Sequence, residues 1–441
     1  MKYKHIAILG LGSSGLATYK YFKKYYPAVN TMAWDDEERV RAKYTNGMKL
    51  QDPATWDFTT LDAIIVSPGI SLYYPKEHLI VTNAKKHKVK ICCDVDIFYE
   101  LNPSKKYIAI TGTNGKSTVV SLIYEMFKSS HKKVALLGNI GTPVFAIATN
   151  EVEYIILELS SFQLSLMNNF KFQCALFLNL TPDHLDYHGN LENYITAKEK
   201  IFNNQGKDDI AIVNSLLPKQ ITSKLTKQKL LLVGKDITIK NNELIDTYFE
   251  DQAVRLDLSK VLIRGVHNQE NIAFAYACAK CFNLDKSIII KVINHFQGLP
   301  HRQQVVKTLH NITFVNDSKA TSPESTLVAL NNFENIILIL GGVAKRDNLD
   351  ILLPQLHTKV LHTFLIGSSS ALFTKILKAN KLAYNVSSSL ENAVNESYAL
   401  ARSIDKPTVV LLSPACASYD MFANFVVRGQ TFIKAVNLLQ G

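Results

Sequence analysis

Short apolar runs alternate with amphipathic stretches along most of this chain. Runs rich in aliphatic and β-branched residues occur at 5–9, 61–66, 107–110, 133–137, 152–157 and 174–178, and again at 312–315, 335–340, 361–366 and 408–412. Several of them are followed by a polar turn and then by a longer segment with apolar residues at helical spacing. Strands that alternate with helices in this way favour parallel sheets. We therefore predict an α/β fold with mostly parallel sheets.

One strand-to-helix turn has the form of a phosphate-binding loop. The apolar run at 107–110 is followed by Thr-Gly-Thr-Asn-Gly-Lys-Ser-Thr at 111–118 and by an apolar helix start. Glycines let backbone N–H groups at a helix start curl around a phosphate. Lys116 would reach the β- and γ-phosphates, and Ser117 or Thr118 would offer a hydroxyl to Mg²⁺. The general pattern has its first glycine where this chain has Ile110, so a simple glycine-rich turn is the alternative.

The first segment also carries a glycine motif after a strand. Gly10, Gly12 and Gly15 form G-x-G-x-x-G, and an acidic cluster at 35–38 follows the next strand, as in a Rossmann-like dinucleotide fold. Such a motif requires only a diphosphate near a helix N-terminus, so NAD and a nucleotide-diphosphate-linked substrate are both compatible. The remaining apolar segments, 80–82 and 89–92, are short, and the unit ends near residue 94. This small size favours a nucleotide-sugar diphosphate over NAD.

Polar side chains follow the strands of the middle segment. Asn139 lies in a turn after 133–137, and Glu158 follows 152–157, where it would hold Mg²⁺ or cap the next helix. A loop at 179–189, rich in His and Asp, contains His184. Asn268 and Asn271 lie three apart on one helix face, which suits adenine or ribose, although a helix cap at Asn268 is equally compatible.

The third segment repeats the strand-and-helix pattern. It begins near His301-Arg302, and a helix is predicted after Ser322 as N-cap and Pro323 as its first residue. Loops at 341–347 and 413–420 follow strands, so both should lie at the carboxyl edge of the sheet, where α/β proteins bind ligands.

Composition narrows the class of protein. The 441 residues, 47% hydrophobic and 20% charged, suit about three globular domains. The net charge of +11 comes from 49 basic and 38 acidic residues, and the lysines are dispersed, which favours small anionic substrates over nucleic acid. Six cysteines show no disulfide framework, and Cys278 and Cys281 lie on a predicted amphipathic helix. No apolar run reaches membrane-spanning length, and we expect no signal peptide before the first strand. We predict a cytoplasmic monomer without membrane insertion.

Together these motifs resemble the Mur ligases, the ATP-dependent amide-bond-forming enzymes of peptidoglycan precursor synthesis. The shared marks are Thr111-Gly-Thr-Asn-Gly-Lys-Ser-Thr118, Glu158-Leu-Ser-Ser-Phe-Gln163, His267-Asn268, His301-Arg302 and Asp317-Ser-Lys319. The segments at 179–188, 317–321 and 412–418 resemble the members that add D-glutamate. The similarity spans all three segments in the family's order.

The resemblance implies three domains: a Rossmann-like UDP-substrate-binding domain at 1–94, a P-loop ATPase-like central domain at 95–300, and a Rossmann-like amino-acid-binding domain at 301–441. The implied substrates are UDP-N-acetylmuramoyl-L-alanine, D-glutamate and ATP with Mg²⁺. Implied ATP contacts are Gly112, Thr113, Asn114, Gly115, Lys116, Ser117, Thr118, Asn268, Asn271, Arg302, Asp317 and Lys319. Implied metal ligands and catalytic groups are Ser117, Glu158, His184 and Lys198, with Lys116; Lys198 matches the family's carbamylated lysine. Implied substrate contacts are Ser13, Ser14, Asp35, Ser67, Gly69, Asn139 and Ser160, with Thr321, Lys345, Ser418 and Phe425 for D-glutamate. Arg302 and Lys319 come from the third segment or its border, so that domain is expected to close over the phosphate loop.

Several alternatives are kept open. Arg346, next to Lys345, is another candidate carboxylate binder. Other Mur ligases and folylpolyglutamate synthetases are the nearest rivals, although the Asp-Asn-Pro-Arg motif of the diamino-acid-adding member is absent from the third segment. A rival from another class is an NAD-binding or nucleotide-binding protein built on Gly10 to Gly15.

Overall fold

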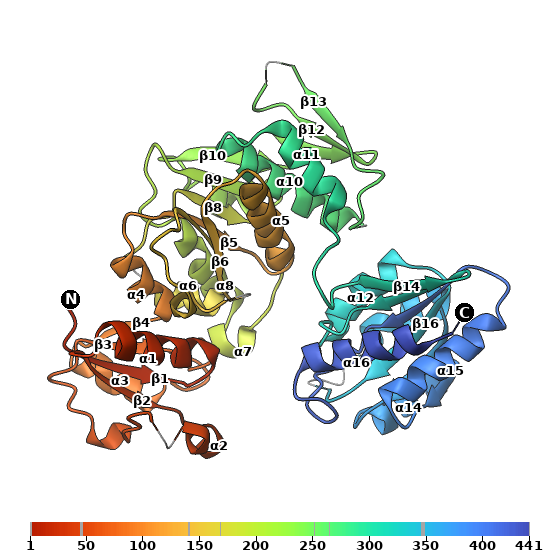
Figure 1. The fold of residues 1–441 in the computed structure, drawn as a ribbon, viewed down its shortest axis with the longest axis horizontal. Coiled ribbons are helices and arrows are strands. Elements are labelled where there is room, and N and C mark those ends of the chain that lie inside the picture. Colours follow the sequence, from red (N-terminus) through yellow and green to blue (C-terminus); the bar gives the residue numbers. More distant parts are fainter. Residues whose placement is uncertain are drawn as a thin grey trace. The chain divides into compact units, whose positions relative to one another are not determined.

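The computed structural model describes residues 2–44, 47–139, 142–167, 169–250, 252–263, 265–344 and 349–440. These residues form three sheets with flanking helices (Figure 1). They divide into two compact units, one of residues 1–261 with 266–296 and one of residues 262–265 with 297–441. Three largely parallel sheets confirm the predicted α/β fold class. The proposed boundaries at 94/95 and 300/301 stay predictions.

The first sheet is parallel throughout, in the order β2-β1-β3-β4. Its strands are β1 His5–Leu9, β2 Asn30–Trp34, β3 Ala63–Val66 and β4 Lys90–Cys92. The helices of this part are α1 Ser13–Tyr25, α2 Glu38–Arg41, α3 Leu79–Lys86 and α4 Asp94–Leu101. The apolar segment at 80–82 lies inside α3, whereas most of the one at 89–92 forms β4.

The central sheet has the order β13-β12-β11-β10-β9-β8-β5-β7-β6. Its strands are β5 Lys106–Thr111, β6 Val134–Gly138, β7 Tyr154–Glu158, β8 Cys174–Phe177, β9 Ile210–Asn214, β10 Lys229–Val233, β11 Ile237–Lys240, β12 Glu243–Asp246 and β13 Val254–Asp257. Only the pairings of β12 with β11 and β13 are antiparallel among these. The helices are α5 Lys116–Ser129, α6 Ser161–Leu166, α7 Leu185–His188, α8 Leu191–Glu199, α9 Lys219–Thr222, α10 Val266–Cys281 and α11 Lys286–His295. Helices α5, α10 and α11 pack against one another beside the sheet (Figure 1).

The first and central sheets share one hydrophobic core. Its buried residues run from Tyr3 in the first segment to Leu225 in the central one. Phe145, in the short 3₁₀ turn Val144–Ala146, packs at 4.6 Å from the ring of Tyr21, 5.9 Å from Phe22 and 5.6 Å from Phe98 (ring centroids). This packing explains why both sheets fall in one compact unit.

The third sheet has the order β14-β15-β19-β16-β17-β18, and only β14 runs antiparallel to its neighbour. Its strands are β14 Gln304–Leu309, β15 Ile312–Asn316, β16 Ile336–Gly341, β17 Val360–Ile366, β18 Tyr384–Val386 and β19 Thr408–Leu412. The helices are α12 Pro323–Asn332, α13 Leu353–Lys359, α14 Ser370–Ala379, α15 Leu390–Arg402 and α16 Phe425–Leu438.

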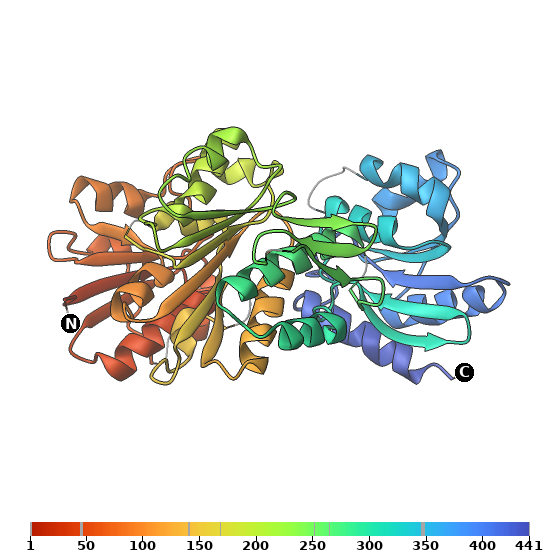
Figure 2. The same cartoon turned by 90° about the horizontal axis from the view of Figure 1, so that it is seen from above.

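Helices cover both faces of this third sheet (Figure 2). Because strand side chains alternate between faces, Ile337 and Ile339 pack with α15 and α16, whereas Leu338 and Leu340 pack with α12, α13 and α14. The predicted cap of α12 is confirmed, since Ser322 accepts a hydrogen bond from the backbone N–H of Ser325.

Two further sequence features have structural counterparts. All six cysteines are free thiols, and Cys278 and Cys281 lie on a helix, α10, as predicted. The predicted amphipathic character of that helix is wrong, because every residue from 271 to 279 is buried. Among the described residues, no helix combines the length and apolarity needed to cross a membrane.

Candidate active site

The glycine-rich segment forms a tight loop between β5 and α5. Gly112 has φ 155° and Gly115 has φ 82°, a left-handed conformation that favours glycine, and α5 begins at Lys116 directly afterwards. A strand, a left-handed turn and a helix start therefore follow one another as in a phosphate-binding loop. The simple-turn alternative does not account for the helix start.

Helix α10 brings Asn271 against this loop. A Cβ on Gly115 would lie 2.2 Å from the Asn271 Oδ1 atom, so only glycine leaves room for this amide. Asn271 is buried and its Nδ2 donates to Asn268 Oδ1 at 3.2 Å. Since α10 begins at Val266, Asn268 lies inside the first turn, and the alternative of a helix cap at Asn268 is wrong.

Two lysine side chains converge on the loop. Lys116 Nζ donates to Gly112 O at 2.8 Å and to Thr113 O at 2.9 Å. Lys198 Nζ donates to the same Gly112 O at 2.8 Å and to Thr111 Oγ1 at 3.3 Å. Lys198 is only 2% exposed, and burial, reinforced by the Lys116 charge, lowers its pKa well below the ordinary value. Lys198 is therefore part of this site and not a surface charge.

A buried carboxylate lies at the end of the neighbouring strand β7. Glu158 is 2% exposed, and its Oε1 accepts a hydrogen bond from Asn139 Nδ2 at 3.0 Å. Its Oε2 is buried with no hydrogen-bond partner among the described residues. A buried oxygen left in this way is suited to a cation. The cap of α6 is Ser160, whose hydroxyl accepts from Gln163 N at 3.2 Å, so the alternative of Glu158 as that cap is wrong.

The donors available for a metal fit Mg²⁺ bound together with a phosphorylated ligand. In the part of the chain that the structure describes, no three His, Cys, Asp or Glu side chains meet closely enough to hold a metal alone. Mg²⁺ usually takes one or two carboxylates and completes its shell with phosphate and water oxygens. Glu158 and the Ser117 hydroxyl in the first turn of α5 suit such a shell.

His184 is the N-cap residue that directly precedes α7, in a left-handed conformation with φ 53°. Its side chain is 46% exposed, with its ring 4.8 Å from that of Phe162. Partial burial lowers the pKa of His184; Lys198 and Lys116 act in the same direction, and nearby Asp183 and Asp186 oppose it. The imidazole is therefore biased toward the neutral form, which is the form that binds metals.

The glycine motif after β1 also forms a close-packed turn. Gly10 has φ 93°, and a Cβ on Gly15 would lie 2.0 Å from Gly10 O, so α1 approaches the strand end closely. Asp35 Oδ2 accepts from Leu11 N at 2.7 Å, and Ser67 Oγ donates to Gly10 O at 3.0 Å. Two of the predicted substrate residues thus meet at this turn.

The other predicted UDP-substrate residues differ in their surroundings. Ser13 and Gly69 are exposed, whereas Ser14 donates a hydrogen bond to the buried Asp94. Tyr187 of α7 donates to Ile70 O at 3.3 Å, which connects the loop after β3 with the central domain. Ser14 therefore has a structural partner that the sequence did not indicate.

The third-sheet unit holds its own group of predicted residues. Asp317 is buried and accepts from Ser413 Oγ at 2.8 Å and from Gln303 N at 3.2 Å. Burial raises the pKa of Asp317 to about 7. Lys319 Nζ lies 3.9 Å from the ring centroid of Phe425. Asp317 and Lys319 directly follow β15, and Phe425 is the first residue of α16.

The predicted D-glutamate contacts of this unit are partly described. Ser418 is buried and Thr321 is partly exposed near the start of α12. Lys345 and the alternative Arg346 lie outside the described residues.

Sequence reasoning missed three side chains that hold these loops. Tyr194 OH lies 3.1 Å from Thr113 Oγ1, and Asn179 bonds to Thr113 and Asn114. Arg428 is 1% exposed and donates to backbone oxygens, one on each of two loops: Ser318 O at 2.9 Å and Cys416 O at 3.0 Å. Burial lowers the pKa of Arg428 to about 10. No spacing rule indicates such contacts, because all of these partners except Cys416 lie more than 60 positions away in the sequence.

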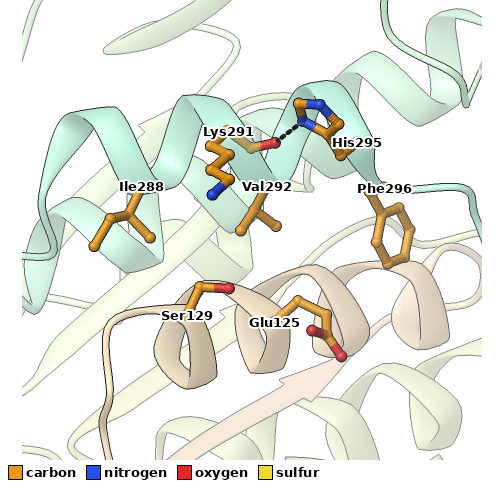
Figure 3. A pocket seen from close by; sticks show the side chains of 7 residues that line it. All are labelled: Glu125, Ser129, Ile288, Lys291, Val292, His295 and Phe296. Carbon is orange, nitrogen blue, oxygen red and sulfur yellow. Dashed lines mark hydrogen bonds between the residues drawn. The ribbon is translucent and has the colours of Figure 1, made fainter.

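A hollow of about 340 Å³ lies between α5 and α11 but is distinct from this site (Figure 3). Its lining comes from the two helices: Glu125, Ser129, Ile288, Lys291, Val292, His295 and Phe296. Glu125 and Ser129 occupy the second half of α5, and Ser129 is about 20 Å along the helix from Lys116 at 1.5 Å per residue. None of the predicted site residues lines this hollow.

Comparison with known proteins gives one consistent family. Residues 110–279 match the Mur ligase middle domain. The chain is 34% identical to the UDP-N-acetylmuramoylalanine--D-glutamate ligase of Rickettsia bellii, covering 99% of this chain and 98% of the relative. It is 36% identical to the protein of the same name from Rickettsia prowazekii, with 98% of each covered. The relative of that name from Clostridioides difficile is 34% identical, with both chains covered in full.

Solved structures show the same fold. The UDP-N-acetylmuramate-alanine ligase MurC of Thermotoga maritima aligns with a TM-score of 0.59 at 18% identity, covering 98% of this chain and 99% of that one. MurF of Acinetobacter baumannii aligns with a TM-score of 0.60 at 16% identity, covering 77% and 79%. The full-length relatives, the family model and the fold agree, and the chain belongs to the Mur ligase family, among the relatives named UDP-N-acetylmuramoylalanine--D-glutamate ligase.

Proposed function

We propose that this chain is an ATP-dependent ligase that joins D-glutamate to UDP-N-acetylmuramoyl-L-alanine in peptidoglycan precursor synthesis. The observation that carries the proposal is the meeting of Lys116 and Lys198 at Gly112 O. This residue directly follows β5, the strand adjacent to the one that ends in the buried Glu158. The relatives' names supply the substrates, and their similarity extends over nearly the whole chain.

The first chemical step needs fixed positive charge. A carboxylate oxygen of the alanyl group attacks the γ-phosphorus of ATP, the bond to the β-phosphate oxygen breaks, and ADP leaves. Because both reactants are anions, the barrier falls when cations already lie beside them. Lys116, which bonds to carbonyl oxygens of the loop, is the group that would turn to the phosphates.

We assign Mg²⁺ binding to Ser117, Glu158, His184 and a carbamylated Lys198. The ion would neutralise phosphate charge during transfer. Burial lowers the pKa of Lys198 and so favours its amine form, which can attack CO₂ and release a proton to give a carbamate. A carbamate would turn an ammonium beside Lys116 into an anionic ligand and remove the repulsion between the two lysines.

The second step forms the amide. The amine of D-glutamate attacks the carbonyl carbon of the acyl phosphate, a tetrahedral intermediate forms, and phosphate leaves as the amine loses a proton. We assign D-glutamate binding to Thr321, Ser418 and the backbone near Phe425, with Lys345 still a prediction. Arg428 supports this assignment indirectly, since it bonds to the loops that carry Thr321 and Ser418.

The UDP part of the substrate is assigned to the residues around the turn after β1 and the loop after β3, namely Ser13, Ser14, Asp35, Ser67 and Gly69. A helix start there suits a diphosphate, and the carboxylate of Asp35 is held by two backbone N–H groups, those of Leu11 and Glu37. Asn139 and Ser160 remain proposed substrate contacts, although each already bonds within the protein. Asn268, Asn271, Arg302, Asp317 and Lys319 remain predicted ATP contacts.

Both nucleotide substrates belong to the cytoplasm, where we propose that the enzyme acts, as a monomer. The test is phosphate release by the purified chain with ATP, Mg²⁺, UDP-N-acetylmuramoyl-L-alanine and D-glutamate, with the product mass measured in parallel. Release should require all three substrates and add one glutamyl group to the product. Lys116→Met should abolish release, whereas Lys207→Met, at an exposed lysine, should leave it unchanged.

Other outcomes would identify the rival functions. Release that needs UDP-N-acetylmuramate and L-alanine would indicate another member of the family. Release with a folate and glutamate would indicate a folylpolyglutamate synthetase. NADH binding without any phosphate release would favour the binding-protein alternative.

A further inference from the structure

Asn179 lies just after β8 and forms hydrogen bonds with the phosphate loop, residues 111–118. Its Oδ1 accepts hydrogen bonds from Thr113 N at 3.1 Å and from Asn114 N at 2.9 Å. Its Nδ2 donates to Asn114 O at 3.1 Å, and its own carbonyl also accepts from Thr113 N at 3.1 Å. One side chain therefore bonds to three backbone groups on two consecutive loop residues.

The neighbours of Asn179 continue this attachment. Leu178 N donates to Thr111 O at 3.0 Å, and Thr181 N donates to Thr113 Oγ1 at 3.0 Å. Residues 178–181 thus run beside 111–114 as an extension of the β5–β8 pairing. The same segment leads directly into the loop that carries His184.

These bonds determine which way the loop presents its backbone. The N–H groups of Thr113 and Asn114 point at Asn179, so a phosphate would be bound by the helix-start side of the loop, from Gly115 onward. Gly112 and Gly115 flank the Thr113-Asn114 pair, and because glycine has no Cβ the backbone is conformationally permissive at both ends of the pair. A loop with such freedom needs external contacts to hold one shape.

A general strand-end role does not explain these contacts. Asn214 ends the neighbouring strand β9, and its Oδ1 accepts a local bond from Leu216 N at 2.9 Å. Asn179 instead bonds to residues 65 and 66 positions earlier in the chain. The two asparagines are thus similar in type and place, but only one of them contacts the loop.

We propose that Asn179 is a positioning residue that holds the phosphate loop in its nucleotide-binding shape before ATP arrives. It also joins this loop to the segment of His184, so that the phosphate and metal ligands keep a fixed geometry. The inference rests on the proposed function, since it assigns ATP to the loop. A loop that becomes ordered only around its ligand loses conformational freedom on binding. A phosphate loop that Asn179 already holds in shape loses little when the nucleotide binds.

The experiment compares Asn179→Ala with Asn214→Ala in the full-length chain. Calorimetry with a non-hydrolysable ATP analogue and Mg²⁺ should show binding weakened about tenfold in N179A and unchanged in N214A. Binding of the UDP substrate should stay within about twofold in both, because its proposed binding residues lie in the first domain. Hydrogen exchange without nucleotide should show protected Thr113 and Asn114 amides in wild type and N214A, and loss of that protection in N179A.

Several results would overturn the proposal. These are wild-type analogue affinity in N179A, an equal loss in N214A, or rapid exchange of the two amides in the wild-type protein. If N179A does not fold, the exchange measurement on the wild type decides alone. If the wild type binds no ATP analogue, the proposed function fails. Protected Thr113 and Asn114 amides would even then support the role of Asn179 in holding the loop.

Discussion

Replacement of Gly115 by alanine tests the contact between the phosphate loop and α10. The new Cβ would lie 2.2 Å from Asn271 Oδ1 and 3.1 Å from Asn271 Cγ. Asn271 is buried, so its amide cannot turn into solvent without breaking its bond to Asn268. The residue at 115 also has φ 82°, which alanine adopts at a cost.

The expected loss of stability has two separable parts. An L-residue in the left-handed region costs roughly 1–2 kcal/mol. Displacing the Asn271 amide and losing its hydrogen bond costs about 1 kcal/mol more. We therefore expect Gly115→Ala to lower the free energy of unfolding by about 2–3 kcal/mol.

A double-mutant cycle isolates the contact. In the Asn271→Ala background, the new methyl group at residue 115 no longer collides with an amide, and only the cost of the left-handed backbone at that residue remains. The Gly115→Ala/Asn271→Ala double variant should therefore be about 1 kcal/mol more stable than the sum of the two single losses predicts. Urea unfolding gives these values, and calorimetry with an ATP analogue should show weaker binding in Gly115→Ala. Gly206→Ala is the control, since its nearest neighbour is the Asp209 Oδ2 atom at 3.9 Å and it has no positive φ. Additive losses, or unchanged stability in Gly115→Ala, would refute the reasoning.

Three further predictions concern the charged groups of the central domain. Glu158→Gln removes a buried charge, so it should keep or raise thermal stability in the absence of Mg²⁺. It should also lower kcat at least about 100-fold, and a wild-type rate would contradict the metal assignment. Lys198→Ala should lose activity and regain part of it with short-chain carboxylic acids, which replace the carbamate; full activity without them would exclude that role. Burial lowers the pKa of His188 to about 4, and the His188 Nε2 atom lies 2.9 Å from Ser161 Oγ. Between pH 6.5 and pH 4 the unfolded chain therefore takes up a proton at His188 that the native chain does not take up. The free energy of unfolding should therefore fall as the pH falls across this window, and the loss should be up to about 3 kcal/mol larger in wild type than in His188→Gln. Urea unfolding measures both losses, and equal losses would show that His188 does not titrate this way.

Local patterns predicted much of the fold. The run at 5–9 forms β1 in full, and Ser322-Pro323 starts α12 where its capping chemistry indicates. The antiparallel strands β12 and β14 were not predicted as such, because their direction depends on partners elsewhere in the sheet. The apolar segment at 80–82 belongs to α3, where three residues are too few to reveal a helical period.

The candidate site was predictable where a motif is continuous. Residues 111–118 could be read directly, since the strand, glycines and helix start are adjacent in sequence. Lys198 could not be distinguished from a surface lysine by spacing; only its resemblance to the family indicated it, and its burial follows from how α8 packs against the loop. The bonds of Asn179 to the phosphate loop and of Arg428 to Ser318 join residues more than 60 and 100 positions apart, respectively, so no local rule indicates them.

The packing of Phe145 has a consequence for synthesis of the chain. The first sheet is complete in sequence at Cys92, but its helix α1 packs Tyr21 and Phe22 against a ring that the ribosome adds about 50 residues later. The nascent first domain therefore exposes an aromatic surface until Phe145 has emerged from the exit tunnel. A pause in translation before that point would prolong this exposure, and a chain truncated there would be open to chaperone binding or aggregation.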